Sequence, residues 1–175
     1  QAEHAASVIR RLRGFLRKGT RRLQQVDAVT LAHEAVGLCA WEASQHQVQI
    51  IEYAEAGLPR LQVDPILLQQ VLLNLLRNAI DANREHYPEH ASQVQLRIVA
   101  QDGQVCIDVI DQGAGVSAEA REQLFVPFYT SKADGLGLGL SMSQGIVEGF
   151  GGSLDALPAE SGGLCLRCLL PAASN

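Results

Sequence analysis

The chain contains 175 residues, of which 47% are hydrophobic and 19% are charged. This length is typical of one domain, or of one domain with a short appendage, and the composition excludes a disordered or fibrous chain. No apolar stretch reaches the roughly 20 residues that a membrane-spanning helix needs. Because the sequence begins Gln1-Ala2-Glu3, without an initiator Met or a signal-peptide pattern, we expect a cytoplasmic piece of a longer protein, whether or not its parent is anchored in a membrane.

The net charge of −5 is distributed unevenly along the chain. Residues 1–26 contain seven basic residues and one acidic residue, whereas residues 27–175 contain seven basic and eighteen acidic residues. The acidic larger part argues against general binding to nucleic acid. A nucleic-acid arm or a membrane-surface helix are alternatives for the basic run. However, Val8, Leu12 and Phe15 recur within it at helical spacing, which favours the solvated face of a helix whose apolar stripe meets a partner helix.

Caps, alternating patterns and turn residues divide the chain into helices and strands. Asp27, Asp64-Pro65 and Ser117 are suited to begin helices, and Asp102-Gly103 is a hairpin signal. In chain order, the predicted elements are helices over residues 1–25 and 28–44, strands over 48–53 and 61–63, a helix over 65–86, strands over 93–101 and 104–111, a short helix ending at Gln123, a helix over 139–149, and strands over 153–157 and 163–170. The pattern predicts an α+β fold, a two-layer sandwich in which helices cover one face of a mixed, mostly antiparallel sheet.

The four cysteines do not form a disulfide framework, because a chain of this size builds its own core. Cys165 and Cys168 have the C-x-x-C spacing but lie in a predicted strand. Residues three apart on a strand point to opposite faces, which is unsuited to chelating one ion. We expect buried, unreactive thiols, and a metal or redox module is the alternative.

The first polar motif lies on the long helix predicted over 65–86. Asn74, Asn78 and Asp81 are spaced i, i+4 and i+7, so they share one face of an otherwise leucine-rich helix. A solvated face is one interpretation. The other is a site for Mg²⁺ beside phosphates, because amide oxygens are hard ligands.

Two glycine motifs follow the long helix. Asp111-Gln-Gly113-Ala-Gly115 follows an apolar strand. It is either a strand-ending turn or an acceptor carboxylate beside bare backbone that a flat ring or a phosphate chain can approach closely. Gly135-Leu-Gly137-Leu-Gly139-Leu140 precedes a helix, where exposed N–H groups form an anion site. Its spacing fits neither the Rossmann fingerprint nor the Walker P-loop.

The order of these motifs, with Phe125-Val-Pro-Phe128 and Lys132 between the last two, resembles the catalytic ATP-binding domain of a two-component sensor histidine kinase. That domain belongs to the superfamily that also contains gyrase B subunits, MutL proteins and the 90-kDa heat-shock chaperones. The resemblance covers about residues 27–171 and is strongest to the nitrogen-regulation and oxygen-sensing subgroup. It implies the Bergerat ATP-binding fold for a domain over residues 27–175.

The resemblance also implies a role for each matching residue. Asp111 would accept a hydrogen bond from the adenine amino group, Asn78 would coordinate Mg²⁺ with help from Asn74, and Lys132 would contact the phosphates. Phe125 and Phe128 would anchor a lid over the nucleotide, and Arg77 is expected to point away from it. The other nucleotide-binding positions implied are Asp81, Gly113, Gly115, Thr130, Ser131, Gly135, Leu136, Gly137, Leu138, Gly139 and Leu140.

Asn74 separates the branches of this superfamily. The gyrase and chaperone branch has a water-activating Glu at this place, and an amide cannot act as a general base. The resemblance therefore implies that Asn74, Asn78 and Lys132 serve transfer of the γ-phosphoryl group of ATP to a His rather than rapid hydrolysis.

The resemblance finally implies partners outside this chain. Residues 1–25 resemble the second helix of the dimerisation and phosphotransfer hairpin, and the only early His, His4, is not followed by the expected acidic residue. We therefore expect the phosphoacceptor His to be absent here, so that the chain alone does not autophosphorylate. A homodimeric parent, its own hairpin and the receiver domain of a response regulator are the expected partners, and nucleic acid is not. A slow ATPase that drives a conformational cycle and a nucleotide-sensing adaptor are the alternatives.

Overall fold

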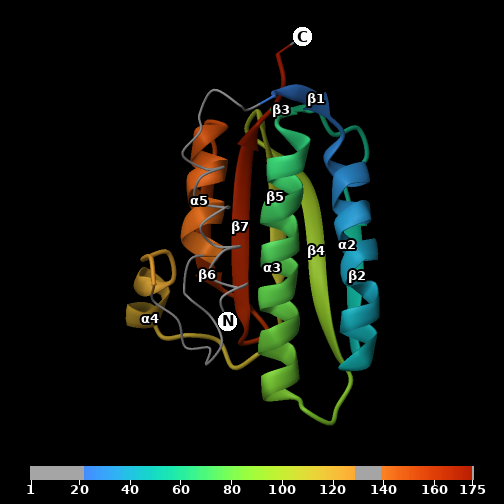
Figure 1. Ribbon diagram of the computed structural model, residues 1–175, viewed down its shortest axis with the longest axis vertical. Helices are drawn as coiled ribbons and strands as arrows, with labels where there is room; N and C mark the ends of the chain where they lie inside the picture. The colour runs from blue at the N-terminus through green and yellow to red at the C-terminus, as the bar shows by residue number, and fades with distance from the viewer. Residues whose placement is uncertain (1–21, 129–138, 175) are drawn as a thin grey trace, which may run out of the picture.

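The computed structural model describes residues 22–128 and 139–174. Helices α2 (Ala28–Gln45), α3 (Pro65–His86) and α5 (Gly139–Gly149) lie side by side over one face of a five-stranded sheet (Figure 1). The strand order is β2 (Val48–Ala54), β4 (Ser92–Gln101), β5 (Gln104–Ile110), β7 (Leu164–Pro171) and β6 (Ser153–Pro158). β2 and β4 are parallel and the other neighbours are antiparallel. The predicted two-layer α+β sandwich with a mixed sheet is confirmed.

Helix α3 is the central helix of the helical layer. The Asp64 carboxylate caps it by accepting hydrogen bonds from the backbone N–H of Ile66 at 2.9 Å and Leu67 at 3.2 Å, and Pro65 occupies the first turn, where a missing N–H costs nothing. Apolar residues at helical spacing turn one stripe of α3 into the core. The buried residues of this helix are Leu68, Val71, Leu72, Leu75, Leu76, Ala79, Ile80 and Asn83.

The hairpin of β4 and β5 forms the centre of the sheet. Its turn residues Asp102 and Gly103 both have positive φ angles, 51° and 79°, which is the backbone of the turn whose twist matches paired strands. β4 alternates between buried and exposed residues, whereas β5 is buried on both faces. The core also contains side chains from α2, α5, β3 and the neighbouring strands, so it fills the space between the helices and one face of the sheet.

One predicted element is wrong at its end. The helix expected over residues 1–25 does not include Gln24 and Gln25, because Gln24–Val26 form strand β1, antiparallel to β3 (Leu61–Val63). Val26 pairs with Leu61, which is fully buried. Pairing with a distant strand thus overrides the local helical preference. Residues 1–21 of the predicted helix lie outside the described residues.

The face of the sheet away from the helices carries a partly buried ion pair, in which Asp108 is buried and the Arg167 side chain is 38% exposed. Arg167 on β7 donates from its Nε and Nη2 atoms to the two oxygens of Asp108 on β5, both at 3.0 Å. Cys165 and Cys168 lie on opposite faces of β7: Cys168 packs in the core and Cys165 shares the open face with Arg167. All four cysteines are buried and free, and burial raises the pKa of the Cys165 thiol to about 12 and that of Cys106 to about 11. The expectation that the thiols are buried is confirmed, and their lack of reactivity stays a prediction.

The described parts of the chain contain neither a helix suited to cross a membrane nor a cluster of metal ligands. No helix within residues 22–128 or 139–174 is both long and apolar enough to cross a membrane. Within the same residues, no three His, Cys, Asp or Glu side chains gather as the ligands of a metal ion would.

Candidate functional site

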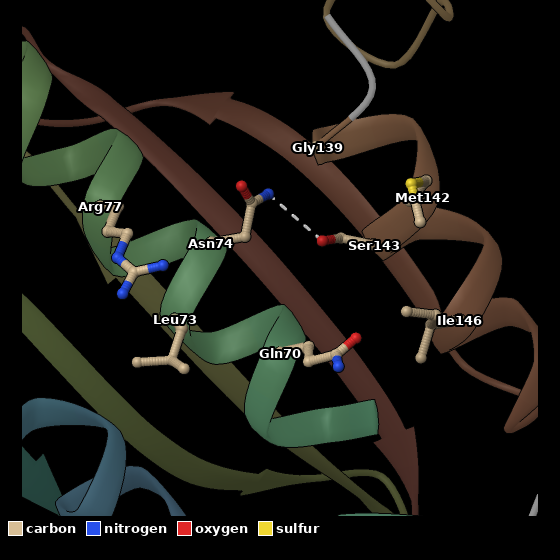
Figure 2. Close-up of a pocket in the computed structure, with 8 residues that line it drawn as sticks. All are labelled: Gln70, Leu73, Asn74, Arg77, Gly139, Met142, Ser143 and Ile146. Carbon is tan, nitrogen blue, oxygen red and sulfur yellow. Dashed lines mark hydrogen bonds between the residues drawn. The ribbon is translucent and has the colours of Figure 1, made fainter. Parts of the chain in front are cut away.

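A cavity of about 130 Å³ lies between α3 and α5 (Figure 2). Polar side chains from α3 and α5 face each other across it, and apolar side chains of both helices complete its wall. The lining residues are Gln70, Leu73, Asn74, Arg77, Gly139, Met142, Ser143 and Ile146. The lining residues of α3 recur three and four positions apart, and so do those of α5. Each helix therefore contributes one face to the cavity.

Asn74 is the residue of the predicted motif that lines this cavity. Its Nδ2 donates a hydrogen bond of 3.2 Å to the Oγ of Ser143, which is buried on α5. Its Oδ1 lies beside Gly139, where a Cβ atom would stand only 2.6 Å from that oxygen. The half-buried amide therefore lies against α5 at two points, and its Nδ2 has a hydrogen-bond partner there.

Asp111 lies at the end of β5, only 5% exposed. Its Oδ1 accepts hydrogen bonds from the backbone N–H of Gly113 at 2.9 Å and of Leu164 at 3.0 Å. Burial raises the pKa of the Asp111 carboxyl, and the two backbone donors oppose that rise because they favour the charged form. Within the described part of the chain, no donor reaches Oδ2, so this oxygen is available as an acceptor.

Glycine backbone forms the walls around Asp111. A side chain on Gly163 would collide with the backbone oxygen of Asp111, and one on Gly113 would stand 2.9 Å from the Cβ of Ala82 on α3. Gly115 has a φ of +77°, in the left-handed region that glycine adopts readily. Gly163 was not among the predicted site residues. The signal that could have found it is the Gly162-Gly163 pair just before β7.

The Asn83 side chain connects the C-terminal part of α3 to the start of β4 and to Gln112, the residue after Asp111. This fully buried side chain donates from Nδ2 to the Ser92 hydroxyl at 3.1 Å and to the Gln93 carbonyl at 2.9 Å, and its Oδ1 accepts from the backbone N–H of Gln112 at 2.7 Å. Asn83 thereby fixes the residue that follows Asp111. Sequence reasoning missed Asn83 because a second amide near the end of a helix carries no recognisable signal.

The other predicted site residues are distributed around this centre. Asp81 is half-buried and pairs with Arg84, with Oδ1 and Nε 3.1 Å apart. Phe125 packs against the core, whereas Phe128 is 70% exposed. Arg77 borders the cavity with Asn74, but its guanidinium lies on the α2 side, with Nε 3.9 Å from Oε2 of Glu42. This is the direction expected from the sequence, and the absence of a contact with the nucleotide stays a prediction.

Leu140 on α5 and Asn78 on α3 are further predicted site residues within the described part of the chain. Leu140 packs against the core, and Asn78 is half-buried on the same side of α3 as Asn74. The remaining predicted positions, Thr130, Ser131, Lys132, Gly135, Leu136, Gly137 and Leu138, lie outside the described residues.

Known proteins resemble this chain in sequence over nearly its full length. It is 36% identical over 171 residues to the C4-dicarboxylate transport sensor protein DctS of Rhodobacter capsulatus, a match that covers 98% of this chain and 26% of the relative. It is 35% identical over 175 residues to the sensor protein FixL of Bradyrhizobium diazoefficiens, covering 100% of this chain and 34% of FixL. The chain therefore spans about a third or less of these relatives.

Solved structures share the fold. The full-length structure of ShkA in complex with AMPPNP matches with a TM-score of 0.82 and 28% identity, over 98% of this chain and 36% of ShkA. The nucleotide-free catalytic domain of the histidine kinase ThkA matches with a TM-score of 0.77 over 86% of this chain and 96% of that domain, at 24% identity. Residues 63–174 match the family described as histidine kinase-, DNA gyrase B- and HSP90-like ATPase. The chain belongs to that family, as the ATP-binding catalytic domain of a sensor histidine kinase.

Proposed function

We propose that this chain binds ATP with Mg²⁺ along α3, from Asp111 at one end to Asn74 at the other, and donates the γ-phosphoryl group to a His outside the described residues. The observation that carries the proposal is the placement of these two polar groups along α3, with Asn74 near the middle of the helix and Asp111 beside its C-terminal part. Gly113, two residues after Asp111, contacts Ala82, and Asn74 lies eight residues earlier. At 1.5 Å per residue this separation is about 12 Å, the order of length of a nucleoside triphosphate.

The Asp111 end suits adenine. The exocyclic amino group of adenine is a hydrogen-bond donor, and the Oδ2 atom of Asp111 is an acceptor that receives no hydrogen bond from the described residues. Guanine presents a carbonyl oxygen at the same ring position, and that oxygen would be repelled by a carboxylate. We therefore expect the site to prefer ATP over GTP.

The Asn74 end suits phosphates and Mg²⁺. Mg²⁺ in nucleotide sites keeps several waters and uses few protein oxygens beside the phosphates. The amide oxygens of Asn74 and Asn78 provide such donors, and the described residues hold no cluster of carboxylates, imidazoles or thiols that would bind a metal alone. The N-terminus of α5 at Gly139 favours negative charge. When bound, Mg²⁺ would neutralise the phosphate charge, and Lys132 and the glycines before α5 are proposed to assist.

The chemistry that the described side chains favour is transfer rather than hydrolysis. No carboxylate from the described residues lines the cavity, and the amide of Asn74 cannot take a proton from water. What remains is positioning and electrostatic stabilisation, the main contributions to phosphoryl transfer. We further propose that the acceptor is a His on the dimerisation hairpin of a homodimeric parent, that the residues before β1 derive from the second helix of this hairpin, and that a receiver domain takes the phosphoryl group next.

Titration of the chain with ATP, ADP and GTP, with and without Mg²⁺, tests the nucleotide site. We expect tightest binding for ATP with Mg²⁺ and loss of most of it in Asp111→Asn, whose NH₂ group faces the adenine donor. The matched control is Asp155→Asn, which changes an exposed carboxylate on β6. This variant should bind ATP as tightly as the wild type does. Equal ATP affinity in wild type and folded Asp111→Asn would refute the placement of adenine.

Phosphoryl transfer is tested in the full-length parent. We expect Asn78→Ala to remove phosphohistidine formation, since the proposal assigns this amide to Mg²⁺. Phosphohistidine that persists unchanged in this variant would overturn the assignment. Release of ADP and phosphate without any phosphohistidine would favour the ATPase alternative instead.

A further inference from the structure

Two residues of α5 hold the side-chain amide of Asn74 in one orientation. Figure 2 shows the Asn74 amide between the helices, with its nitrogen directed to the hydroxyl of Ser143 and its oxygen on the other side. Ser143 is only 3% exposed, so water does not readily replace it as a hydrogen-bond partner. Gly139, one turn before Ser143 on the same face of α5, leaves room for Oδ1, because a Cβ atom there would stand 2.6 Å from this oxygen.

The orientation matters because the two ends of an amide have opposite chemistry. The NH₂ group donates to a phosphate oxygen, whereas the carbonyl oxygen binds a cation or a water of its hydration shell. In this structure Nδ2 is engaged by Ser143, and Oδ1 is the end that remains beside the first turn of α5. A serine hydroxyl within a helix commonly donates its proton to the carbonyl one turn earlier, which leaves the lone pairs of Oγ for an amide donor.

The geometry points to Ser143 and Gly139 as positioning residues that present Asn74 to the nucleotide as an oxygen ligand for Mg²⁺ or its water. Ser143 does not touch the nucleotide in this role. Ser143 acts through its hydrogen bond, and Gly139 acts through the absence of a side chain. This inference rests on the proposed function, and it deepens it by assigning the chemical end of Asn74 that works in the site.

The readout that tests the inference is the Mg²⁺ dependence of ATP binding, not the stability of the fold. We expect Ser143→Ala to raise the Mg²⁺ concentration for half-maximal ATP binding by roughly three- to tenfold, the change expected when one hydrogen bond is lost. Ser143→Thr keeps the hydroxyl and should stay within about twofold of wild type, as one retained hydrogen bond requires. Gly139→Ala should act in the same direction as Ser143→Ala, because its methyl group would displace Oδ1.

Ser92→Ala is the matched control. It removes a second buried serine hydroxyl that accepts from an asparagine on α3, at 3.1 Å from Asn83 Nδ2. This variant should lower the melting temperature as Ser143→Ala does, but it should leave the half-maximal Mg²⁺ concentration unchanged. A similar Mg²⁺ shift in both variants would mean that general loosening of α3 explains the effect, and this would overturn the inference.

The double variant Asn74→Ala/Ser143→Ala separates this inference from the proposed function. Once Asn74 is absent, loss of Ser143 should add no further Mg²⁺ shift, because the two residues act as one unit. If Asn74→Ala alone leaves the Mg²⁺ dependence unchanged, the role of Asn74 in the proposed function fails. If Asn74→Ala shifts it but Ser143→Ala and Gly139→Ala do not, only the positioning role fails.

Discussion

Replacing Asn83 with Ala should destabilise the domain and loosen the segment that carries Asp111. Asn83 is fully buried and makes three hydrogen bonds, two from Nδ2 and one to Oδ1. They join α3 to the start of β4 and to the residue after Asp111. The substitution removes a partner from two backbone groups, the carbonyl of Gln93 and the N–H of Gln112.

The expected loss of stability follows from the two backbone groups that lose their hydrogen-bond partner. A buried polar group left unsatisfied costs about 1–3 kcal/mol, and both bonds are only partly buried, which lets water recover some of that cost. We expect a loss of about 2–4 kcal/mol in the free energy of unfolding, a large share of the roughly 5–15 kcal/mol typical of a domain. For a chain of this length that corresponds to a melting temperature lower by about 5–15 °C.

Urea denaturation followed by far-ultraviolet circular dichroism measures this loss. Arg84→Ala is the control, because Arg84 is the next residue of α3 and its side chain is 45% exposed; its loss should stay within about 0.5 kcal/mol. At a temperature where both variants are folded, Asn83→Ala should also bind ATP more weakly, whereas its half-maximal Mg²⁺ concentration should match wild type. A loss below about 1 kcal/mol, or one equal to that of Arg84→Ala, would refute the reasoning that these hydrogen bonds hold the segment.

Three further predictions concern other charged and ionisable groups. Because burial raises the pKa of Asp111 above 3.8, its contribution to stability falls as pH rises through that raised value. Asp111→Asn should therefore gain stability relative to wild type as the pH rises above about 4, where the carboxyl titrates in the unfolded chain, and a difference that stays constant with pH in denaturation experiments would contradict this. Arg167→Ala leaves the Asp108 carboxylate buried without its ion pair, and we expect a loss of about 3 kcal/mol in unfolding free energy; a loss under about 1 kcal/mol would show that the carboxylate is solvated. Cys165 and Cys168 should react with a thiol reagent at neutral pH only after unfolding, because burial raises both pKa values, and rapid labelling of the folded chain would be the contrary result.

Local signals in the sequence predicted most of the fold. Asp64 followed by Pro65 gave the start of α3, and the Asp102-Gly103 pair gave the β4–β5 turn. Both signals work through hydrogen bonds or φ angles within a few residues, so they need no knowledge of the tertiary structure. Strand β1 was missed because it has three residues and gains its stability from pairing with β3, more than thirty residues later.

The candidate site was predictable only in part, for a similar reason. Asn74 and Asp111 were found because polar residues in apolar surroundings are conspicuous. The residues that hold them, Ser143 and Asn83, look ordinary in the sequence. Ser143 meets Asn74 across 69 positions, and Asn83 meets Gln112 across 29. Such contacts depend on how helices pack, which spacing along the chain does not encode.

The arrangement of α3 constrains its sequence twice. One stripe of the helix fills the core, and the opposite stripe carries the amides that face α5. One residue inserted between Asn74 and Asn83 would rotate the part of α3 after the insertion by about 100° relative to the part before it. Asn74 and Asn83 would then no longer face their partners at the same time. Asp64 extends this constraint to the start of the domain, because its Oδ1 caps α3 while its Oδ2 accepts from the backbone N–H of Arg22 at 3.0 Å. A displacement of the chain before β1 would therefore act directly on the N-terminus of α3, the helix that carries Asn74.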